Sequence, residues 1–236
     1  MAPTTTIPNE KLESCIPKLI DAMKKCQNAA ELCGLIENHD LPGKNKAQYP
    51  PLPFSISEEE VKSLEEAGWL TLRSEKDKSS VYVLDVEQFE QASSLEKLLL
   101  ALIWKNGDLA KIHHIVLGIK GEPAENGRLV FHAFGSHLAN PTENPIIDQH
   151  VIRAYQLLKY FSHEENNDPS ELDKIRKKTA FTAGDKALVD GYMAWVRGEG
   201  NSDSMLNIIP AAVRNDSGYL RALDDLLFAV GRYAAV

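Results

Sequence analysis

The sequence contains no uninterrupted apolar run close to the ~18 residues that a membrane-spanning helix requires, so it predicts no membrane span. At the N-terminus, the residues MAPTTTIPNEKLES lack the basic start and apolar stretch of a secretory signal, and we expect none. The three cysteines, Cys15, Cys26 and Cys33, form no CxxC pair. This pattern predicts reduced thiols in a cytoplasmic protein and gives no support for a zinc or iron–sulfur site.

Positive charge is also scarce, because 26 Lys and Arg residues face 34 Asp and Glu residues and leave a formal net charge of -8. This balance argues against a protein that coats nucleic acids without specificity, since such binding comes from neutralising phosphates. It is compatible with a local basic groove on an acidic body. The 236 residues are 43% apolar and 25% charged, which is typical of a globular protein whose core needs no disulfide or metal.

Hydrophobic spacing predicts a mainly α-helical protein in three segments. Residues 1–56 combine a helical segment, with a helix start expected near Pro17, and a proline-rich connector. Residues 57–94 begin with a capped helix and continue as one small β-hairpin near residues 69–84. Residues 95–236 are helical almost throughout and are expected to form one compact unit of two lobes.

Glycines and polar breaks separate the helices expected in this last segment. The expected helices cover residues 95–104, 109–117, 128–138, 148–161, 170–178, 184–197, 204–214 and 217–234. A glycine-bearing hairpin over residues 118–127 joins the second helix to the third. A short loop over residues 140–147 joins the third helix to the fourth.

The most informative stretch is the loop and helix start over residues 144–155, NPIIDQHVIRAY. Pro145 and the two isoleucines make a rigid, dry loop, and Asp148 follows at the predicted N-terminus of a helix. An aspartate there is a common N-cap that contributes about 1 kcal/mol, so capping alone accounts for it. The preceding order of helix, glycine hairpin, helix and short loop favours a functional role as well.

This order of elements resembles the helix-hairpin-helix DNA glycosylase superfamily, the group of endonuclease III and 8-oxoguanine glycosylase. In that family a hairpin that ends in glycine leads into a helix, as Gly127 and Arg128 do here, and a Pro-Val-Asp-Thr-His-Val-x-Arg type of segment follows. Residues 145–153, PIIDQHVIR, match that segment with one extra residue before Asp148. The resemblance covers residues 95–160 and implies a helix-hairpin-helix glycosylase-like helical bundle in two lobes.

The resemblance further implies hydrolysis of the N-glycosidic bond of a damaged or modified base, flipped out of double-stranded DNA. Asp148 would be the catalytic residue, since a fixed carboxylate can stabilise an oxocarbenium-like sugar and orient or deprotonate a water. The base pocket would lie between the helical halves, with Trp104, Lys105 and Gln149 as candidates. DNA contacts are expected at Gly118, Lys120, Gly121, Gly127, Arg128, His150 and Arg153. Neither a metal nor an organic cofactor is expected.

Arg128 stands near the position where bifunctional members of the family carry a Schiff-base lysine. A guanidinium cannot supply a neutral amine, so the resemblance implies a monofunctional enzyme that uses water. The sequence does not reveal the base, and both DNA repair and antiviral defence against modified phage DNA stay open.

Two other functions stay open. The acidic charge and the long hairpin favour a non-catalytic helical module that retains the fold and binds protein or nucleic acid. For Trp104, the alternative to a place in the base pocket is packing in the core. A metal-dependent hydrolase would combine Asp148 with the five histidines that cluster in the sequence, His113, His114, His132, His137 and His150. Against it, residues two apart on a helix diverge by about 200°. The basic run over residues 174–178, KIRKK, is either a solvated face or a contact to the phosphate backbone.

Overall fold

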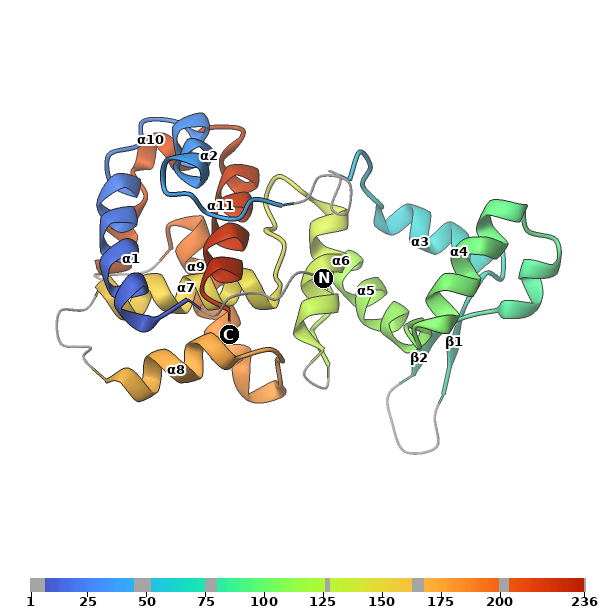
Figure 1. Ribbon diagram of the computed structural model, residues 1–236. Coiled ribbons are helices and arrows are strands. Elements are labelled where there is room, and N and C mark those ends of the chain that lie inside the picture. The colour runs from blue at the N-terminus through green and yellow to red at the C-terminus, as the bar shows by residue number, and fades with distance from the viewer. Residues whose placement is uncertain are drawn as a thin grey trace. The chain divides into compact units, whose positions relative to one another are not determined.

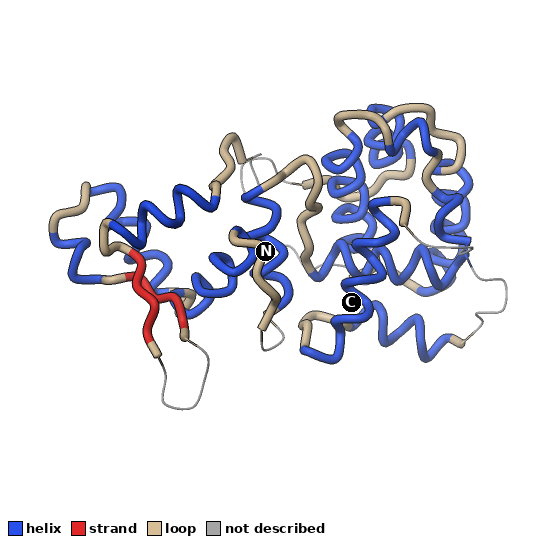
Figure 2. Tube along the Cα trace, turned by 180° about the vertical axis from the view of Figure 1, so that it is seen from behind, coloured by secondary structure: helices blue, strands red, loops and turns tan. Residues whose placement is uncertain are grey.

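The structure, a computed structural model, describes residues 7–44, 52–74, 80–125, 128–162, 168–199 and 204–235. Within them the protein has eleven α-helices and one antiparallel sheet of two strands (Figures 1 and 2). The predicted mainly helical fold with a small β-hairpin is therefore confirmed. The chain forms two compact units: unit 1 comprises Met1–Pro51 and Pro145–Val236, and unit 2 comprises Leu52–Asn144.

These units differ from the segments expected from the sequence. The expected boundary between residues 94 and 95 falls inside unit 2, and the N-terminal segment joins the C-terminal helices in unit 1. The reason is packing, because a two-stranded hairpin is too small to have a core of its own. Here it shares a core with a later helix, where His113 Nδ1 accepts a hydrogen bond from the backbone N–H of Tyr82 at 3.2 Å.

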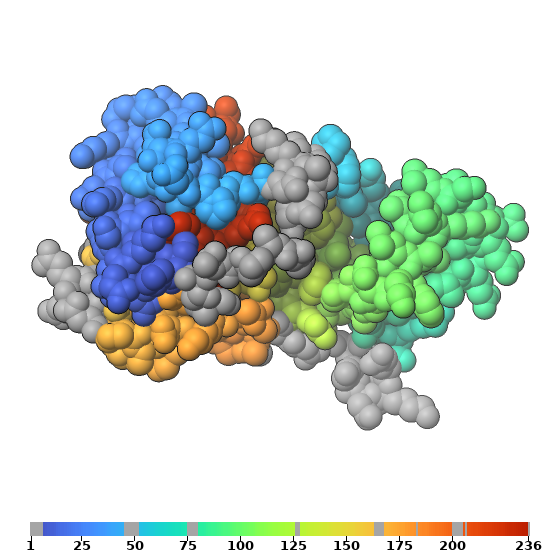
Figure 3. Space-filling view, in the orientation of Figure 1, coloured from blue at the N-terminus to red at the C-terminus, as the bar shows by residue number. Residues whose placement is uncertain are grey.

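Unit 1 is organised around α11 (Tyr219–Tyr233), which packs against α7 (Gln149–Ser162) and α2 (Ala29–Asn38) (Figure 1). Only part of α11, drawn in red, is visible in Figure 3, because blue N-terminal residues cover it. The other helices of unit 1 are α1 (Asn9–Met23), α8 (Pro169–Lys177), α9 (Lys186–Arg197) and α10 (Ala211–Arg214), with 3-10 turns at Ala183–Asp185 and Ser204–Ile208.

The expected helix start near Pro17 is wrong, since Pro17 lies inside α1. A proline in a helix interior removes one backbone hydrogen bond. Burial offsets that cost, because Leu12, Ile16 and Leu19 are fully buried on a helix that packs against α7.

Unit 2 begins with α3 (Glu58–Glu66), which Ser57 and Glu60 start with a reciprocal capping box. Strands β1 (Leu70–Arg73) and β2 (Val81–Leu84) then pair with Leu70 opposite Leu84, and they are red in Figure 2. The remaining elements are 3-10 turns at Val86–Glu90 and Leu109–Lys111 and the helices α4 (Ser94–Lys105), α5 (Ile112–Ile119) and α6 (Leu129–Ala139). The core of unit 2 is formed by Val61, Leu70, Tyr82, Val116, Leu117, Ile119 and Leu138.

Two glycines bring α5 and α6 into backbone contact. A Cβ on Gly118 would lie 2.0 Å from the carbonyl oxygen of His132, and a Cβ on Gly135 would lie 2.1 Å from that of Ile115. Only glycine permits helices to approach this closely. The expected hairpin start at residue 118 is therefore wrong, because α5 continues to Ile119.

Helix α4 is well formed but contributes nothing to a core. Ser93 and Glu96 make a capping box at its start, yet none of its residues is buried. Four leucines spaced i, i+3, i+4 and i+7 share one face of the helix. They are Leu95, Leu98, Leu99 and Leu102, each between 50% and 68% exposed. The green segment of Figure 3 shows this helix at the surface.

Candidate active site at the start of helix α7

Asp148 is the N-cap of α7, as the sequence predicts. Its Oδ1 accepts a hydrogen bond from the backbone N–H of Val151 at 2.8 Å. The loop before it is held by Pro145, which is buried, and by Ile147, whose side chain is 2% exposed. The carboxylate is therefore fixed on a rigid, apolar support, with one oxygen engaged by the helix and the positive end of the helix dipole beside it.

The start of α7 rests directly on α11. A Cβ on Gly231 would lie 1.8 Å from the carbonyl oxygen of His150, so the two backbones touch. Arg153 fastens the contact by donating a hydrogen bond from Nη1 to the Gly231 carbonyl oxygen at 3.0 Å. The rings of His150 and Phe228 also meet edge to face, with centroids 4.9 Å apart.

A partly buried ion pair joins Lys44, in the chain after α2, to Asp224, one turn before Phe228 on α11. Lys44 is hydrogen-bonded to Asp224, its Nζ is 3.1 Å from Asp225 Oδ1, and it also lies over the Phe228 ring. Burial raises the pKa of Asp224 to about 6, although the Lys44 ammonium opposes that rise. The charges of Asp148 and Asp225 raise the pKa of Asp224 further.

Tyr192 on α9 carries another buried polar group of unit 1. Its side chain is fully buried, and within the described residues its hydroxyl has no hydrogen-bond partner. Burial raises the pKa of Tyr192, and the charges of Asp224 and Asp148 add to the rise. A buried hydroxyl without a partner is costly.

The sequence did not predict Lys44, Tyr192 or Asp224 as site residues. The available signal was Asp224 itself, which falls on the apolar face of the last helix, where a charge needs a partner. That partner, Lys44, is 180 positions away in the chain. Spacing along the sequence gives no indication of such a pair.

Two residues expected to contact DNA have structural roles instead. Arg153 is 2% exposed and donates to the backbone carbonyls of Gly231 and Lys178 and to His150 Nδ1. Its guanidinium is therefore not accessible to a phosphate. His150 is half-buried, and burial lowers its pKa. Because Arg153 donates to its Nδ1, the imidazole is neutral and is a poor phosphate ligand.

The residues of the expected hairpin are also only partly available for contact with DNA. Gly118 is buried in the contact between α5 and α6, and so its backbone N–H faces no ligand. Lys120 lies 2.7 Å from the Tyr82 hydroxyl and 3.1 Å from Glu65, and both contacts raise its pKa. Gly121 is exposed and ends α5 with a φ of +66°, and Arg128 is exposed at the start of α6. Gly127 lies outside the described residues.

The three expected base-pocket residues do not belong to one unit. Gln149 is the first residue of α7 in unit 1, whereas Trp104 and Lys105 end α4 in unit 2. Trp104 is 68% exposed, and so the alternative in which it packs in the core is wrong. Lys105 is an exposed charge in the last turn of its helix.

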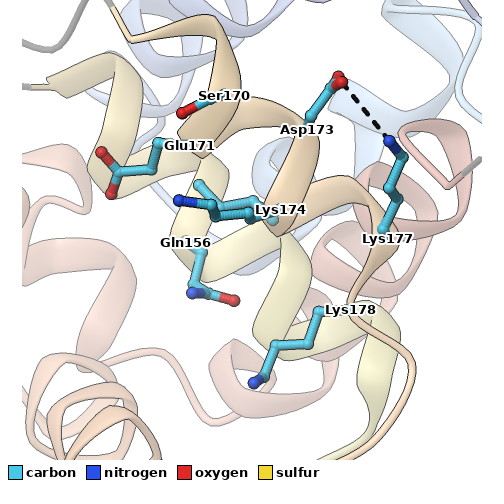
Figure 4. Close-up of a pocket in the computed structure, with 8 residues that line it drawn as sticks. Gln156, Ser170, Glu171, Asp173, Lys174, Lys177 and Lys178 are labelled. Atoms are coloured by element: carbon cyan, nitrogen blue, oxygen red, sulfur yellow. Dashed lines mark ion pairs between the residues drawn. The ribbon is translucent and has the colours of Figure 1, made fainter.

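A groove of about 660 Å³ lies beside α8 and carries three lysines of the basic run (Figure 4). Lys177 is paired with Asp173 at 3.6 Å, and Lys178 is paired with Asp185 at 2.6 Å. Lys174 lies beside Gln156 in the groove. Arg176 points the other way, is 4% exposed, and binds the Ala234 carbonyl oxygen. The groove can attract an anion through Lys174, but most of its positive charge is already neutralised.

The candidate metal ligands can be located in the described part of the chain. There, no three side chains among His, Cys, Asp and Glu gather closely enough to hold a metal ion. His113 is buried against the hairpin, and His132 and His137 contact backbone carbonyl oxygens.

None of the described helices has the length and apolar character needed to cross a membrane.

Comparison with known proteins gives no relative from which a role can be taken. No protein-family model matches the chain, and no curated protein or solved structure is significantly similar to it. The function therefore has to be argued from the site itself.

Proposed function

We propose that the protein is a DNA N-glycosylase that hydrolyses the bond between deoxyribose and a damaged or modified base. The single observation that carries the proposal is Asp148, a carboxylate fixed at a helix N-terminus on an apolar support. The order of elements supports it, because the close helix pair α5 and α6 is followed by a short loop and then Asp148. That order agrees with the resemblance to helix-hairpin-helix glycosylases.

The proposed reaction requires one fixed negative charge near the sugar. As the glycosidic bond breaks, positive charge develops on the sugar, and the Asp148 carboxylate stabilises it and orients the attacking water. The second carboxylate oxygen of Asp148 performs these roles, because Oδ1 accepts the hydrogen bond from the Val151 N–H. The base must first leave the duplex, which costs a few kcal/mol.

In this proposal, fewer residues contact DNA than the sequence suggested. Arg128, exposed at the start of α6, and Lys174, in the groove beside α8, are two described basic groups that remain suited to phosphates. Arg153 and Lys120 instead make hydrogen bonds within the protein, to the Gly231 carbonyl oxygen and the Tyr82 hydroxyl respectively. Binding should therefore rest on few phosphates and depend weakly on salt.

The decisive test is mass spectrometry of the bases released from a panel of damaged and virally modified duplexes. Asp148→Asn keeps a capping side chain but removes the charge, and we expect base release to fall at least ~100-fold. Asp168→Asn is the matched control, because Asp168 caps α8 through the Ser170 N–H, and it should leave base release unchanged. The product should be an intact abasic strand, with no adduct trapped by borohydride. Full activity in Asp148→Asn would refute the assignment.

A second function is favoured by one observation, the exposed leucine face of α4. A contiguous apolar surface of this kind marks a contact with another molecule. The protein would then be a non-catalytic helical module that binds a protein. Absence of base release from every duplex in the panel would favour this function over the glycosylase.

A further inference from the structure

The exposed apolar side chains of the protein are concentrated in one of its two units. Within the described residues, every large hydrophobic side chain that is strongly exposed lies in unit 2. They are Leu52, Phe54, Leu64, Leu72, Val86, Leu95, Leu98, Leu99, Leu102 and Trp104. Single exposed leucines are normal on a protein surface, but a contiguous stripe marks a contact with another molecule. The only such stripe within the described residues of α4 is the leucine face, which we define as Leu95, Leu98, Leu99 and Leu102.

The leucine face has the spacing of a helix-packing surface. Apolar residues at i, i+3, i+4 and i+7 form one stripe along a helix, and folded proteins bury such a stripe against another element. Leu100 lies nearly opposite the stripe and is partly buried, and so α4 contacts unit 2 through other side chains. No charged residue occurs from Leu98 to Trp104. The middle of the stripe therefore suits an apolar partner surface.

Negative charge predominates around the leucine face. Residues 85–108, which are α4 and the turns on either side of it, contain five Asp and Glu and two Lys. Glu87 and Glu90 are exposed in the 3-10 turn before α4, and Lys97 Nζ joins the helix to that turn by donating to the Glu90 carbonyl oxygen at 2.9 Å. Residues 52–144, which form unit 2, contain 15 acidic and 9 basic residues. A complementary partner therefore has positive charge beside its apolar side chains.

The size and the charge of this surface argue against two other occupants. The stripe covers two turns, about 10 Å along a helix about 10 Å wide, whereas each partner in a stable interface buries about 800 Å². A second copy would bring acidic residues against acidic residues, because each chain has a formal net charge of -8. An anionic membrane surface would be repelled for the same reason. A basic partner gains an attraction that both of these occupants lack.

We propose that the leucine face of α4 is a docking surface for an amphipathic helix of another protein, with an apolar stripe of about two turns flanked by lysine or arginine. The leucine face packs against that stripe, and Glu87 and Glu90 attract the flanking cations. Because the contact is small, the complex is transient, with a Kd in the micromolar range. This inference specifies the partner of the second candidate function and does not depend on glycosylase activity.

The first test uses a fluorescein-labelled synthetic peptide of about 18 residues, long enough to form a helix. It has leucines at i, i+3, i+4 and i+7 with lysines on both sides of them, and fluorescence anisotropy measures its binding to the full chain. One comparison peptide has glutamates in place of the lysines, and another has alanines in place of the leucines. The lysine–leucine peptide should bind at least ~10-fold more tightly than either. Equal binding of any comparison peptide, or no binding at all, would overturn the inference.

Variants of the protein assign this binding to α4. Leu98→Lys places a charge in the middle of the leucine face and should weaken binding of the lysine–leucine peptide at least ~10-fold. The control Leu72→Lys, at a leucine that is 56% exposed on β1, should leave binding unchanged. Glu90→Lys should weaken binding at least ~3-fold, whereas Glu37→Lys makes the same change of net charge on α2 and should have no effect. Equal losses in a variant and its control would refute the docking surface.

The remaining measurements distinguish the other occupants. Sedimentation velocity of the full chain detects a second copy, and flotation with vesicles of phosphatidylcholine and phosphatidylglycerol detects a membrane surface. A dimer or a vesicle complex that Leu98→Lys abolishes would overturn the inference. Circular dichroism shows whether the variants fold, and Leu95→Lys, at a side chain that is 64% exposed, replaces Leu98→Lys if that variant does not.

Base release by the same proteins separates this inference from the proposed function. Leu98→Lys should release bases as wild type does, because the leucine face is not part of the candidate active site. Peptide binding without base release from any duplex would refute the glycosylase and keep the docking surface. Base release without binding of the lysine–leucine peptide would refute the docking surface and keep the glycosylase.

Discussion

Substituting Gly118 by alanine tests the close contact between α5 and α6. The added Cβ would lie 2.0 Å from the His132 carbonyl oxygen and 2.9 Å from the Ser136 nitrogen. Both are backbone atoms of α6, so no side chain can rotate away and the helices must separate. Overpacking a tight contact costs about 1–3 kcal/mol, and a clash with backbone belongs at or above the upper end. We expect Gly118→Ala to lower the free energy of unfolding of unit 2 by about 3 kcal/mol.

Gly34→Ala is the matched control for that substitution. Gly34 also lies within a helix, α2, but a Cβ there would meet nothing within 4 Å. Alanine is favoured over glycine in a helix interior by about 0.5–1 kcal/mol, so this variant should be more stable than wild type. The two substitutions are chemically identical and should have opposite signs.

Urea unfolding followed by circular dichroism measures both variants, and hydrogen exchange of the α5 and α6 amides assigns the loss to unit 2. If Gly118→Ala were as stable as wild type, the helices could not be in backbone contact. Gly118 would then again be a candidate for the expected DNA contact, and the reasoning that removes it from the site would be refuted.

Three further predictions concern charge and exposure. The stability of wild type relative to Asp224→Asn should fall by about 3 kcal/mol as pH rises from 3.8 to 7, because the folded protein keeps the Asp224 proton up to a pKa of about 6 and the unfolded chain releases it near 3.8. Urea unfolding at several pH values measures this difference, and a flat difference would contradict the buried carboxyl. Arg128→Ala should weaken binding to modified and unmodified duplexes alike and reduce the salt dependence of binding by about one unit of slope. The control Lys186→Ala removes a cation paired with Asp190 and should change neither the affinity nor the slope. A loss of binding confined to one base would show that Arg128 reads the base. Leu98→Lys on α4 should change the free energy of unfolding by less than about 0.5 kcal/mol, since the side chain is 68% exposed, and a larger loss in thermal unfolding would place that leucine in a core.

Local signals in the sequence predicted most of the secondary structure. The Ser57 and Glu60 capping box starts α3, two apolar runs around a polar stretch mark β1 and β2, and Asp148 caps α7 as expected. The caps depend on residues three positions apart and the hairpin on two neighbouring segments, and so a single sequence contains these signals.

The errors have a common physical origin in contacts between distant residues. Gly118 looks like a turn residue but serves helix packing, because Gly135 faces it from another helix. Arg153 looks like a DNA-binding cation but satisfies carbonyl oxygens at residues 178 and 231. The Lys44–Asp224 pair likewise joins segments that no local pattern connects. Tertiary packing decides whether a charge or a glycine is available to a ligand.

The discontinuity of unit 1 has a consequence for how the protein folds during synthesis. Helix α2 packs on α11, yet about 180 residues separate Asn38 from Tyr219. At ~5–20 residues per second, the ribosome delivers α11 about 10–40 s after α2. Over that interval the apolar face of α2 lacks its partner α11, whereas unit 2 is contiguous and is complete well before α11 is made. The N-terminal helices are therefore the part of the nascent chain that most needs protection by a chaperone, and premature termination before α11 would leave unit 1 without its central helix.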